Sequence, residues 1–311
     1  MRAVGFFEFG GPDVLQLLDL PQTQPGPGQV RVRVHAATVN PTDTLLRNGS
    51  RAQSLQDVAP PHVPGMDVAG VIDAIGPNTS TDLVLGDSVM AMVNNRGSHG
   101  GYRESIVLSA DSVVHIPDGV SLVEAATLPM NGLTAKQTLD QLALKPGQTL
   151  AVTGAAGCYG GYVIQLAKQA GLRVIADASA ADEALVRSFG ADTVVPRGQD
   201  IAGQIRKVVP NGVDGLADGS YQSELSIGAV RDGGGFATVR GWSMEQRGIV
   251  CHATWVRQYD HRADLLRQLR QDVQAGVITL RVAATYAPAQ AAEAHRRLEA
   301  GGTRGRLVIV F

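Results

Sequence analysis

Three glycines, Gly154, Gly157 and Gly160, lie between an apolar run at 149–153 and a helical pattern at 162–170. Because glycine lacks a Cβ atom, the backbone of such a turn can approach a ligand closely. The N-terminus of the following helix offers unpaired N–H groups and the positive end of the helix dipole, which favour a pyrophosphate. The pattern predicts a nucleotide-binding turn, and a tight turn that binds nothing is the alternative.

An acid and two further polar residues follow at the ends of the next two expected strands. Asp177 lies 23 residues after Gly154 and 20 after Gly157, where an acid commonly holds the ribose diol of NAD. Ser179 and Arg197 offer a hydroxyl and a guanidinium at the same adenosine end, and a guanidinium suits a 2′-phosphate. The alternatives are a solvated loop acid or helix N-cap for Asp177 and an exposed loop arginine for Arg197.

These residues need a scaffold of alternating strands and helices, and the sequence between residues 121 and 256 has that pattern. Apolar runs with turn residues between them predict strands at 149–153, 173–176, 193–195, 213–217 and 236–239, with helices at 162–170, 181–189, 201–209 and 224–230. Regular βα alternation at this spacing predicts an α/β fold with a doubly wound parallel sheet.

The regions on either side of this segment differ from it. Residues 1–120 contain short alternating apolar runs bounded by Gly, Pro and Asp, which predicts a β-rich domain. The tail 257–311 shows two helical patterns and a final strand, and it is too small to bury a core alone. We therefore expect one domain from 1–120 together with 257–311, and a second domain at 121–256.

The composition excludes several classes of protein. Hydrophobic residues make up 44% of the 311 residues, and 27 basic side chains face 29 acidic ones, so a nucleic-acid-binding surface is not expected. The two cysteines, Cys158 and Cys251, are too few for a disulfide framework or a cysteine-rich zinc site. No apolar run reaches the ~18 residues that span a membrane, and the N-terminus has no signal-peptide pattern. We expect a cytoplasmic protein with no membrane partner.

Seven motifs in order along the chain resemble the zinc-independent quinone oxidoreductase branch of the medium-chain dehydrogenase/reductase superfamily. They are Phe9-Gly-Gly-Pro-Asp-Val-Leu, Thr38-Val-Asn-Pro-Thr-Asp, Pro64-Gly-Met-Asp-Val-Ala-Gly-Val-Ile, Gly86-Asp-Ser-Val, Gly100-Gly-Tyr-Arg-Glu, Leu128-Pro-Met-Asn-Gly-Leu-Thr-Ala and Ala155-Ala-Gly-Cys-Tyr-Gly. The resemblance implies a GroES-like β-rich catalytic domain and a Rossmann cofactor domain. Cys158 and Tyr159 depart from it, because the family has Gly-Val at these positions of the phosphate loop.

The resemblance also implies which residues form the site. The loop residues expected at the pyrophosphate are Ala155, Ala156, Gly157, Cys158, Tyr159 and Gly160. Thr134 is expected near the nicotinamide ribose or the phosphates, and the segment Val239-Arg240-Gly241 is expected to line the cofactor groove. Asn40 is expected at the nicotinamide, as a catalytic and cofactor-binding residue.

Asp43 is expected to brace the loop of Asn40 as part of the catalytic set. The alternatives are a turn residue before Pro41 for Asn40 and a helix N-terminal acid for Asp43. Zinc-dependent relatives have metal ligands where this chain has Asn40 and Met66, so no metal is expected.

The function that this resemblance implies is an NADPH-dependent reduction of quinones or α,β-unsaturated carbonyl compounds by direct hydride transfer. An enoyl-thioester reductase of the same superfamily and a redox-sensing cofactor-binding protein with little turnover are the alternatives. Arg197 and Ser179 favour NADPH, whereas Asp177 favours NADH. Substrate specificity is expected in loops 47–62 and 94–99 and in segment 242–256. The run 248–255 predicts a strand at the sheet edge and, through it, a homodimer.

Overall fold

The computed structural model describes residues 1–95 and 99–311, and within these ranges the chain forms two units. The first contains Met1–Met130, Asp260–Gln274 and Leu280–Phe311, and the second contains Asn131–Tyr259 and Ala275–Thr279. The first unit thus extends ten residues past the expected boundary at 120. Residues 96–98 of the expected specificity loop 94–99 lie outside the described residues.

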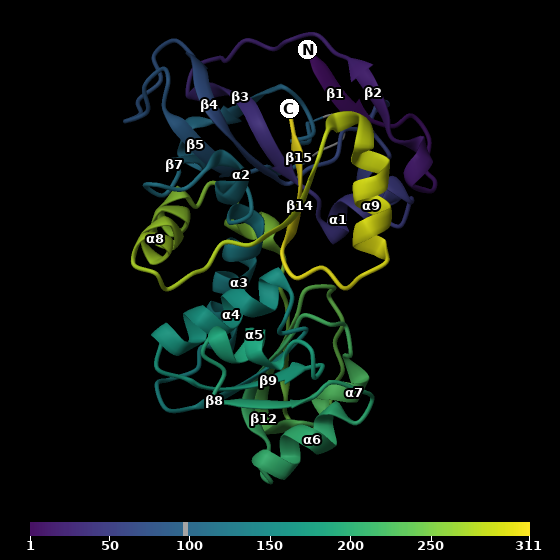
Figure 1. Cartoon of the computed structure of the whole chain (residues 1–311), viewed down its shortest axis with the longest axis vertical. Coiled ribbons are helices and arrows are strands. Elements are labelled where there is room, and N and C mark those ends of the chain that lie inside the picture. The colour runs from purple at the N-terminus through teal and green to yellow at the C-terminus, as the bar shows by residue number, and fades with distance from the viewer. Residues whose placement is uncertain (96–98) are drawn as a thin grey trace. The chain divides into compact units, whose positions relative to one another are not determined.

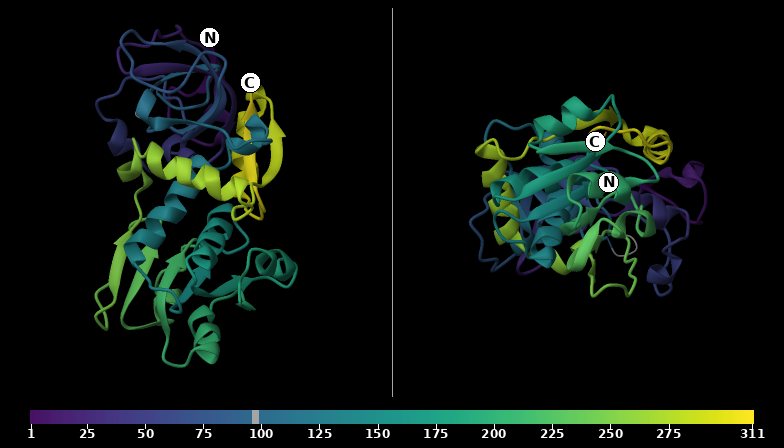
Figure 2. Two further views of the ribbon diagram at one scale, coloured as in Figure 1. Left: turned by 90° about the vertical axis from the view of Figure 1, so that its left-hand side faces the viewer. Right: turned by 90° about the horizontal axis from the view of Figure 1, so that it is seen from below.

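The first unit is built on a sheet with the order β14-β15-β3-β4-β5-β7, in which β6 also pairs with β3. In β3 (Gln29–Thr38), buried Val32 and Val34 alternate with exposed Arg33 and His35, so one face of the sheet packs on the core. β15 (Arg306–Val310) pairs antiparallel with β3, which joins the C-terminal strands to the N-terminal part of the unit (Figure 2).

The other strands of this unit surround that pair. They are β4 (Asp67–Ile75), β5 (Ser88–Met92), β6 (Ser105–Ser109), β7 (Val113–His115) and β14 (Val282–Tyr286), with β1 (Arg2–Gly5) and β2 (Gln16–Asp19) as a separate antiparallel pair. The helices of the unit are α1 (Pro41–Arg47), α2 (Leu122–Ala125), α8 (Ala263–Gln274) and α9 (Ala291–Glu299). Short 3₁₀ helices lie at Pro12–Val14, Ala52–Leu55, Ala110–Ser112 and Pro288–Gln290.

The second unit is a doubly wound parallel sheet with the strand order β10-β9-β8-β11-β12-β13. Its strands are β8 (Thr149–Thr153), β9 (Arg173–Ala178), β10 (Thr193–Pro196), β11 (Val213–Asp218), β12 (Val230–Thr238) and β13 (Val250–Ala253). Figure 1 shows α4 (Cys158–Gln169) and α5 (Glu183–Ser188) on one side of this sheet and α6 (Ile201–Val208) and α7 (Glu224–Ile227) on the other. The long helix α3 (Pro129–Leu142), from Asn131 onward, and a 3₁₀ turn at Val256–Tyr259 complete it.

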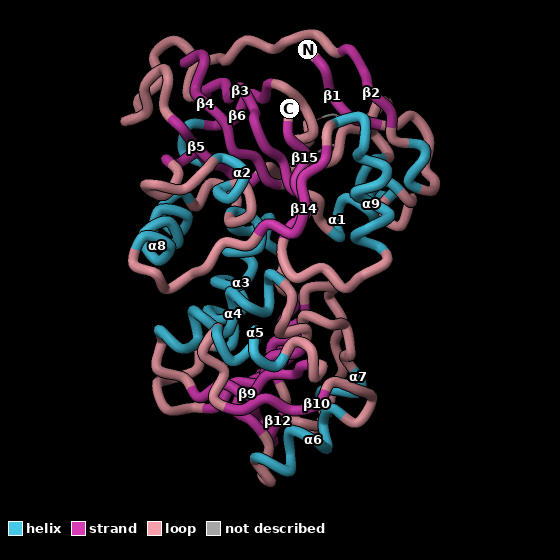
Figure 3. Tube along the Cα trace, viewed as in Figure 1, coloured by secondary structure: helices cyan, strands magenta, loops and turns pink. Residues whose placement is uncertain are grey.

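These two architectures confirm the expected fold class. The first unit is a GroES-like β-rich domain, and the second is a Rossmann-like domain with a parallel sheet. Figure 3 shows how the two units differ in secondary structure, since the strands of the second unit alternate with helices along the chain. In such a parallel sheet the carboxyl ends of all strands meet at one edge, and ligands bind there.

Candidate active site

The glycine turn after β8 has a geometry that only glycine fits. Gly154 has φ = +67°, and a Cβ there would lie 2.9 Å from the carbonyl carbon of Gly219. At Gly160 a Cβ would lie 2.5 Å from the carbonyl oxygen of Gly154, so α4 packs directly against the turn. Helix α4 begins at Cys158, with Gly157 as its N-cap, four residues before the expected start at 162. The N-terminus of a 12-residue helix therefore opens from this turn.

Asp177 faces the turn from the next strand. Its Oδ1 accepts a hydrogen bond from the backbone N–H of Ala155 at 3.0 Å, and its side chain is buried. Burial raises the pKa of Asp177, while the N–H groups of the turn and the charge of Arg197 act in the opposite direction. Within the described ranges Oδ2 is buried and accepts no hydrogen bond. A buried acceptor beside a glycine turn fits the ribose hydroxyls of a nucleotide.

The two residues expected at the adenosine end lie at neighbouring strand ends. The backbone N–H of Arg197 donates to the carbonyl of Ala178 at 2.9 Å, next to Ser179. The side chain of Arg197 is exposed and forms no ion pair with the part of the chain that the structure describes. The hydroxyl of Ser179 donates to the carboxylate of Asp182 at 2.6 Å. Ser179 can therefore accept from a ligand, but its proton already has a partner.

Tyr159, one of the two departures from the family motif, ties the turn to α3. Its hydroxyl lies 2.8 Å from Oγ1 of Thr138, and Thr138 donates to the carbonyl of Thr134 at 2.9 Å. Since Thr138 has one proton, Tyr159 is the donor in the first bond. Burial raises the pKa of Tyr159, which keeps this donor neutral. Thr134 is buried in the same helix, and the other departure, Cys158, is a buried free thiol.

The segment Val239-Arg240-Gly241 follows β12 on the same carboxyl edge of the sheet. The guanidinium of Arg240 stacks on the ring of Tyr221, with its carbon 3.5 Å from the ring centroid. Gly241 has φ = +74°, and a Cβ there would lie 2.7 Å from the indole of Trp255. Tyr221 was not expected at the site, because no motif in the sequence marks it.

Asn40 and Asp43 lie in the first unit, at the start of α1. The carboxylate of Asp43 accepts from the backbone N–H of Asn40 and from that of Gly65, each at 2.9 Å. Both side chains are fully buried. Burial raises the pKa of Asp43 to about 6, and these backbone donors act in the opposite direction. Asp43 thus braces the turn that carries Asn40, and it also acts as a helix N-terminal acid.

The Asn40 side chain belongs to a buried ion-pair cluster. Its Nδ2 donates to Oδ2 of Asp67 at 3.0 Å, and its Oδ1 accepts from the guanidinium of Arg306. Arg306 pairs with Asp67 at 3.1 Å, and Thr38 donates to the same carboxylate at 2.5 Å. Neither Asp67 nor Arg306 was expected at the site from the sequence. The available signal was a charged residue at the head of each of two apolar strand patterns.

Met66, the second position at which zinc-dependent relatives have a ligand, has a different neighbour here. Its sulfur accepts a hydrogen bond from Thr42 at 3.1 Å. Across residues 1–95 and 99–311, no three His, Cys, Asp or Glu side chains form a group that could hold a metal ion. The polar side chains around Asn40 are instead organised by the guanidinium of Arg306.

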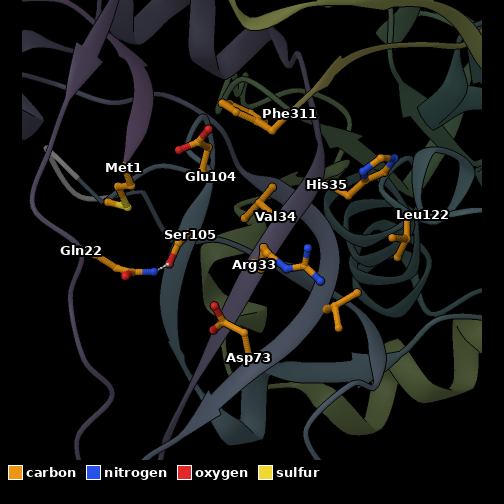
Figure 4. A pocket seen from close by; sticks show the side chains of 11 residues that line it. Met1, Gln22, Arg33, Val34, His35, Asp73, Glu104, Ser105, Leu122 and Phe311 are labelled. Carbon is orange, nitrogen blue, oxygen red and sulfur yellow. Dashed lines mark hydrogen bonds between the residues drawn. The ribbon is translucent and has the colours of Figure 1, made fainter.

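A separate cavity of about 610 Å³ lies in the first unit (Figure 4). Its lining includes Arg33 and His35 from β3, Asp73 from β4 and Glu104, and none of the expected site residues. Its carboxylates are already paired, Asp73 with Arg31 and Glu104 with Arg2, each at 2.7 Å. This cavity therefore lies apart from the expected site residues.

Comparison with known families agrees with the fold of the two units. The alcohol dehydrogenase GroES-like domain family matches residues 26–118, and the zinc-binding dehydrogenase family matches residues 189–309. The human quinone oxidoreductase is 30% identical over 331 residues, covering 100% of this chain and 98% of that protein. The chain therefore belongs to the quinone oxidoreductase branch of the medium-chain dehydrogenase/reductase superfamily.

Further relatives differ in their cofactor or substrate. A mycobacterial protein solved in complex with NADPH has a TM-score of 0.87 and 28% identity, and an NAD-dependent alcohol dehydrogenase has 0.87 and 29%, each covering 100% of both chains. A trans-enoyl reductase from Aspergillus terreus is 35% identical over 191 residues, 60% of this chain and 53% of that protein. The fold and the oxidoreductase class are shared, together with a nicotinamide cofactor.

None of the helices within residues 1–95 and 99–311 combines the length and the apolar character that crossing a bilayer needs.

Proposed function

We propose that this chain is an NADPH-dependent oxidoreductase that reduces quinones or α,β-unsaturated carbonyl compounds by direct hydride transfer, without zinc. The observation that carries the proposal is the glycine turn with Asp177 bonded to it, in a chain that belongs to the quinone oxidoreductase branch. The cofactor, when bound, supplies the hydride. The protein supplies binding, orientation and exclusion of water.

The cofactor would be held by the turn residues 155–160 and by the strand ends that follow them. The N-terminus of α4 suits the pyrophosphate, and Asp177 Oδ2 suits a ribose hydroxyl. We favour NADPH because Arg197, whose side chain is exposed, is bonded through its backbone N–H to Ala178, the residue before Ser179, at the expected adenosine end. Ser179 would contribute as an acceptor, since its proton is donated to Asp182.

The proposed independence from zinc is supported by the side chains at the two positions where zinc-dependent relatives have ligands. Asn40 Oδ1 already accepts from the guanidinium of Arg306, and the sulfur of Met66 accepts from Thr42. Asn40 then acts as a polar side chain held in one orientation by Asp67 and Arg306. We assign it to the nicotinamide end of the site, and we assign Asp43 to bracing its turn.

The test is steady-state oxidation of NADPH with a series of quinones, enals and a trans-enoyl thioester. Deuterium from NADPH labelled at the nicotinamide C4 should appear at the β-carbon of a reduced enal, which is the mark of direct hydride transfer. Activity should survive a chelator. Loss of activity on chelation that zinc restores would overturn the zinc-independent proposal, and turnover with none of the acceptors would overturn the oxidoreductase proposal.

Enoyl-thioester reduction is the second candidate, and the observation that favours it is the trans-enoyl reductase relative. The same assay separates the two functions. A kcat/KM for the enoyl thioester well above that for every quinone and enal would favour this candidate.

We also propose that the chain forms a homodimer through β13. This strand lies at the edge of the sheet, and Val250 is 54% exposed there. An exposed edge can pair with a second copy across a two-fold axis. Light scattering at micromolar concentration should give the mass of a dimer, and Val250→Pro should shift the mass toward that of a monomer.

A further inference from the structure

A series of buried hydrogen bonds in the first unit leads from Arg47, through His295 of α9 and Tyr102, to Asp43. Arg47 NH1 lies 3.3 Å from Nδ1 of His295, and Nε2 of His295 lies 3.2 Å from the hydroxyl of Tyr102. That hydroxyl lies 3.3 Å from Oδ2 of Asp43. Arg47 also donates to the partly exposed Glu299 at 2.5 Å, which balances its charge. Each of the four side chains from Arg47 to Asp43 is at most 2% exposed.

The direction of this chain is set by Arg47, because a guanidinium can only donate. Nδ1 of His295 must therefore accept, and in the neutral ring Nε2 carries the proton. Burial and the charge of Arg47 lower the pKa of His295 to about 3, in agreement with a neutral ring. Nε2–H donates to the Tyr102 oxygen, so the Tyr102 hydroxyl can donate its own proton to Asp43. The Asp43 carboxylate therefore accepts a hydrogen bond from Tyr102.

Protonation of Asp43 would disturb this order. Its Oδ2 already accepts from Tyr102 and from the N–H of Asn40, so a proton there would turn the Tyr102 hydroxyl back toward His295. The ring would then need its proton on Nδ1, where it would face the N–H of Arg47. Two donors would oppose each other in a site without water.

Charged groups outside this series of hydrogen bonds also act on Asp43 and Tyr102. Asp67 raises the pKa of Asp43, and it raises the pKa of Tyr102 as well, while Arg306 lowers that of Tyr102. None of these groups lies in the chain of hydrogen bonds itself. The chain therefore adds a contribution that opposes the effects of burial and of Asp67.

We propose that Tyr102 and His295 are positioning residues for the Asn40 turn, because they transmit the donor direction of Arg47 to Asp43 and keep its carboxylate an acceptor. That carboxylate holds the backbone N–H groups of Asn40 and Gly65. His295 of helix α9, more than 250 residues later in the sequence, thus influences the ionisation of Asp43 beside Asn40, the proposed nicotinamide contact. The effect on catalysis rests on the proposed function, but the effect on Asp43 does not.

The experiment is a pH titration of the Asp43 side-chain carboxyl by carbon NMR in the free protein. In Tyr102→Phe the midpoint should rise by about half a unit to one unit, because the charged form loses one hydrogen bond. His295→Leu should raise it in the same direction, and His295→Gln, which keeps a donor toward Tyr102, should restore part of the shift. Tyr286→Phe is the matched control, since Tyr286 is a partly buried tyrosine of the same unit outside the chain.

Each result decides the proposal. An unchanged midpoint in the two variants that break the chain would overturn it, and so would an equal shift in Tyr286→Phe. If Tyr102→Phe does not fold, the His295 pair alone gives the answer. In a working enzyme the acid limb of kcat/KM for a quinone should move by the same amount, with the Kd for NADPH unchanged. A shifted midpoint in a protein that reduces no acceptor would retain the positioning role and overturn the proposed function.

Discussion

The carboxylate of Asp177 accepts a hydrogen bond from the backbone N–H of Ala155 at 3.0 Å. The acid at the end of β9 therefore supports the turn that follows β8. One of the two oxygens of this acid is thus committed to the turn, a structural role that does not depend on which nicotinamide cofactor binds.

Two replacements of Asp177 separate its support of the turn from its charge. Asp177→Ala removes the acceptor for Ala155, and the affinity for NADPH and NADH should fall by about 1–1.5 kcal/mol each. Asp177→Asn keeps an acceptor for that N–H and should lose much less. Calorimetric titration of both cofactors measures this. Equal losses in the two variants would mean that the charge, and not support of the turn, is what matters.

Arg197→Ala tests the choice of cofactor. The affinity for NADPH should fall by about 1–3 kcal/mol because a charge-assisted bond is lost, while that for NADH should hardly change. Arg187→Ala is the control, since Arg187 is a half-exposed arginine of the same unit that pairs with Glu183. An equal loss for both cofactors, or tighter NADH binding in the wild type, would return the selecting role to Asp177.

Gly160→Ala should disrupt the turn. The added methyl group would meet the carbonyl oxygen of Gly154 at 2.5 Å and Cα of Ala155 at 2.8 Å. We expect a loss of about 1–3 kcal/mol in the free energy of unfolding, together with weak binding of either cofactor. At Gly198 a Cβ would have no neighbour within 4 Å, so Gly198→Ala should leave both measurements unchanged. Denaturant unfolding and cofactor titration compare the pair.

Arg306→Ala should leave the buried carboxylate of Asp67 without its ion partner. Removal of one member of a buried pair lowers the free energy of unfolding by about 3–5 kcal/mol. Arg296 pairs with Asp13 at the surface, where both side chains are at least half exposed, and Arg296→Ala should lower it by less than about 1 kcal/mol. Similar losses in the two variants would contradict a buried ion pair at Asn40.

The pKa of Asp43, raised from 3.8 to about 6 by burial, predicts how stability depends on pH. Between these values the folded chain binds more protons at this site than the unfolded chain does, so stability falls as pH rises. The free energy of unfolding of the wild type, relative to Asp43→Asn, should decrease by about 2 kcal/mol from pH 4 to pH 7. Urea unfolding across this range measures it, and a constant difference would contradict the shift.

Local patterns in the sequence were sufficient for much of the second unit. The apolar run 149–153 is β8, and the parallel order of the sheet follows the predicted alternation of strands and helices. The predicted helix 224–230 is shorter, since α7 ends at Ile227 and β12 begins at Val230. The glycine-rich run 233–235 lies within β12, where the register with β11 shifts between Val230 and Gly235 and Gly233 has φ = +68°, so these glycines form an irregularity of the strand.

The candidate site was predicted unevenly for a physical reason. Glycine spacing and the acid 20 residues later are local signals, and they predicted a nucleotide-binding turn with Asp177 as a ribose ligand, whereas the bond from Ala155 to Asp177 was not predicted. The cluster of Asn40, Asp67 and Arg306 joins residues separated by up to 266 positions. Neither its partners nor its hydrogen-bond directions can be derived from neighbours in sequence, because they depend on the pairing of β15 with β3.

The position of β15 has a consequence for the order of assembly during synthesis. The sheet of the second unit has all its strands once residue 253 has been made. In the first unit β15 separates β14 from β3, so its sheet stays incomplete until residues 306–310 emerge. Although domains usually fold in the order in which they are made, here the later-encoded sheet should close first. The ion pair at Asn40 then forms among the last contacts of the nascent chain.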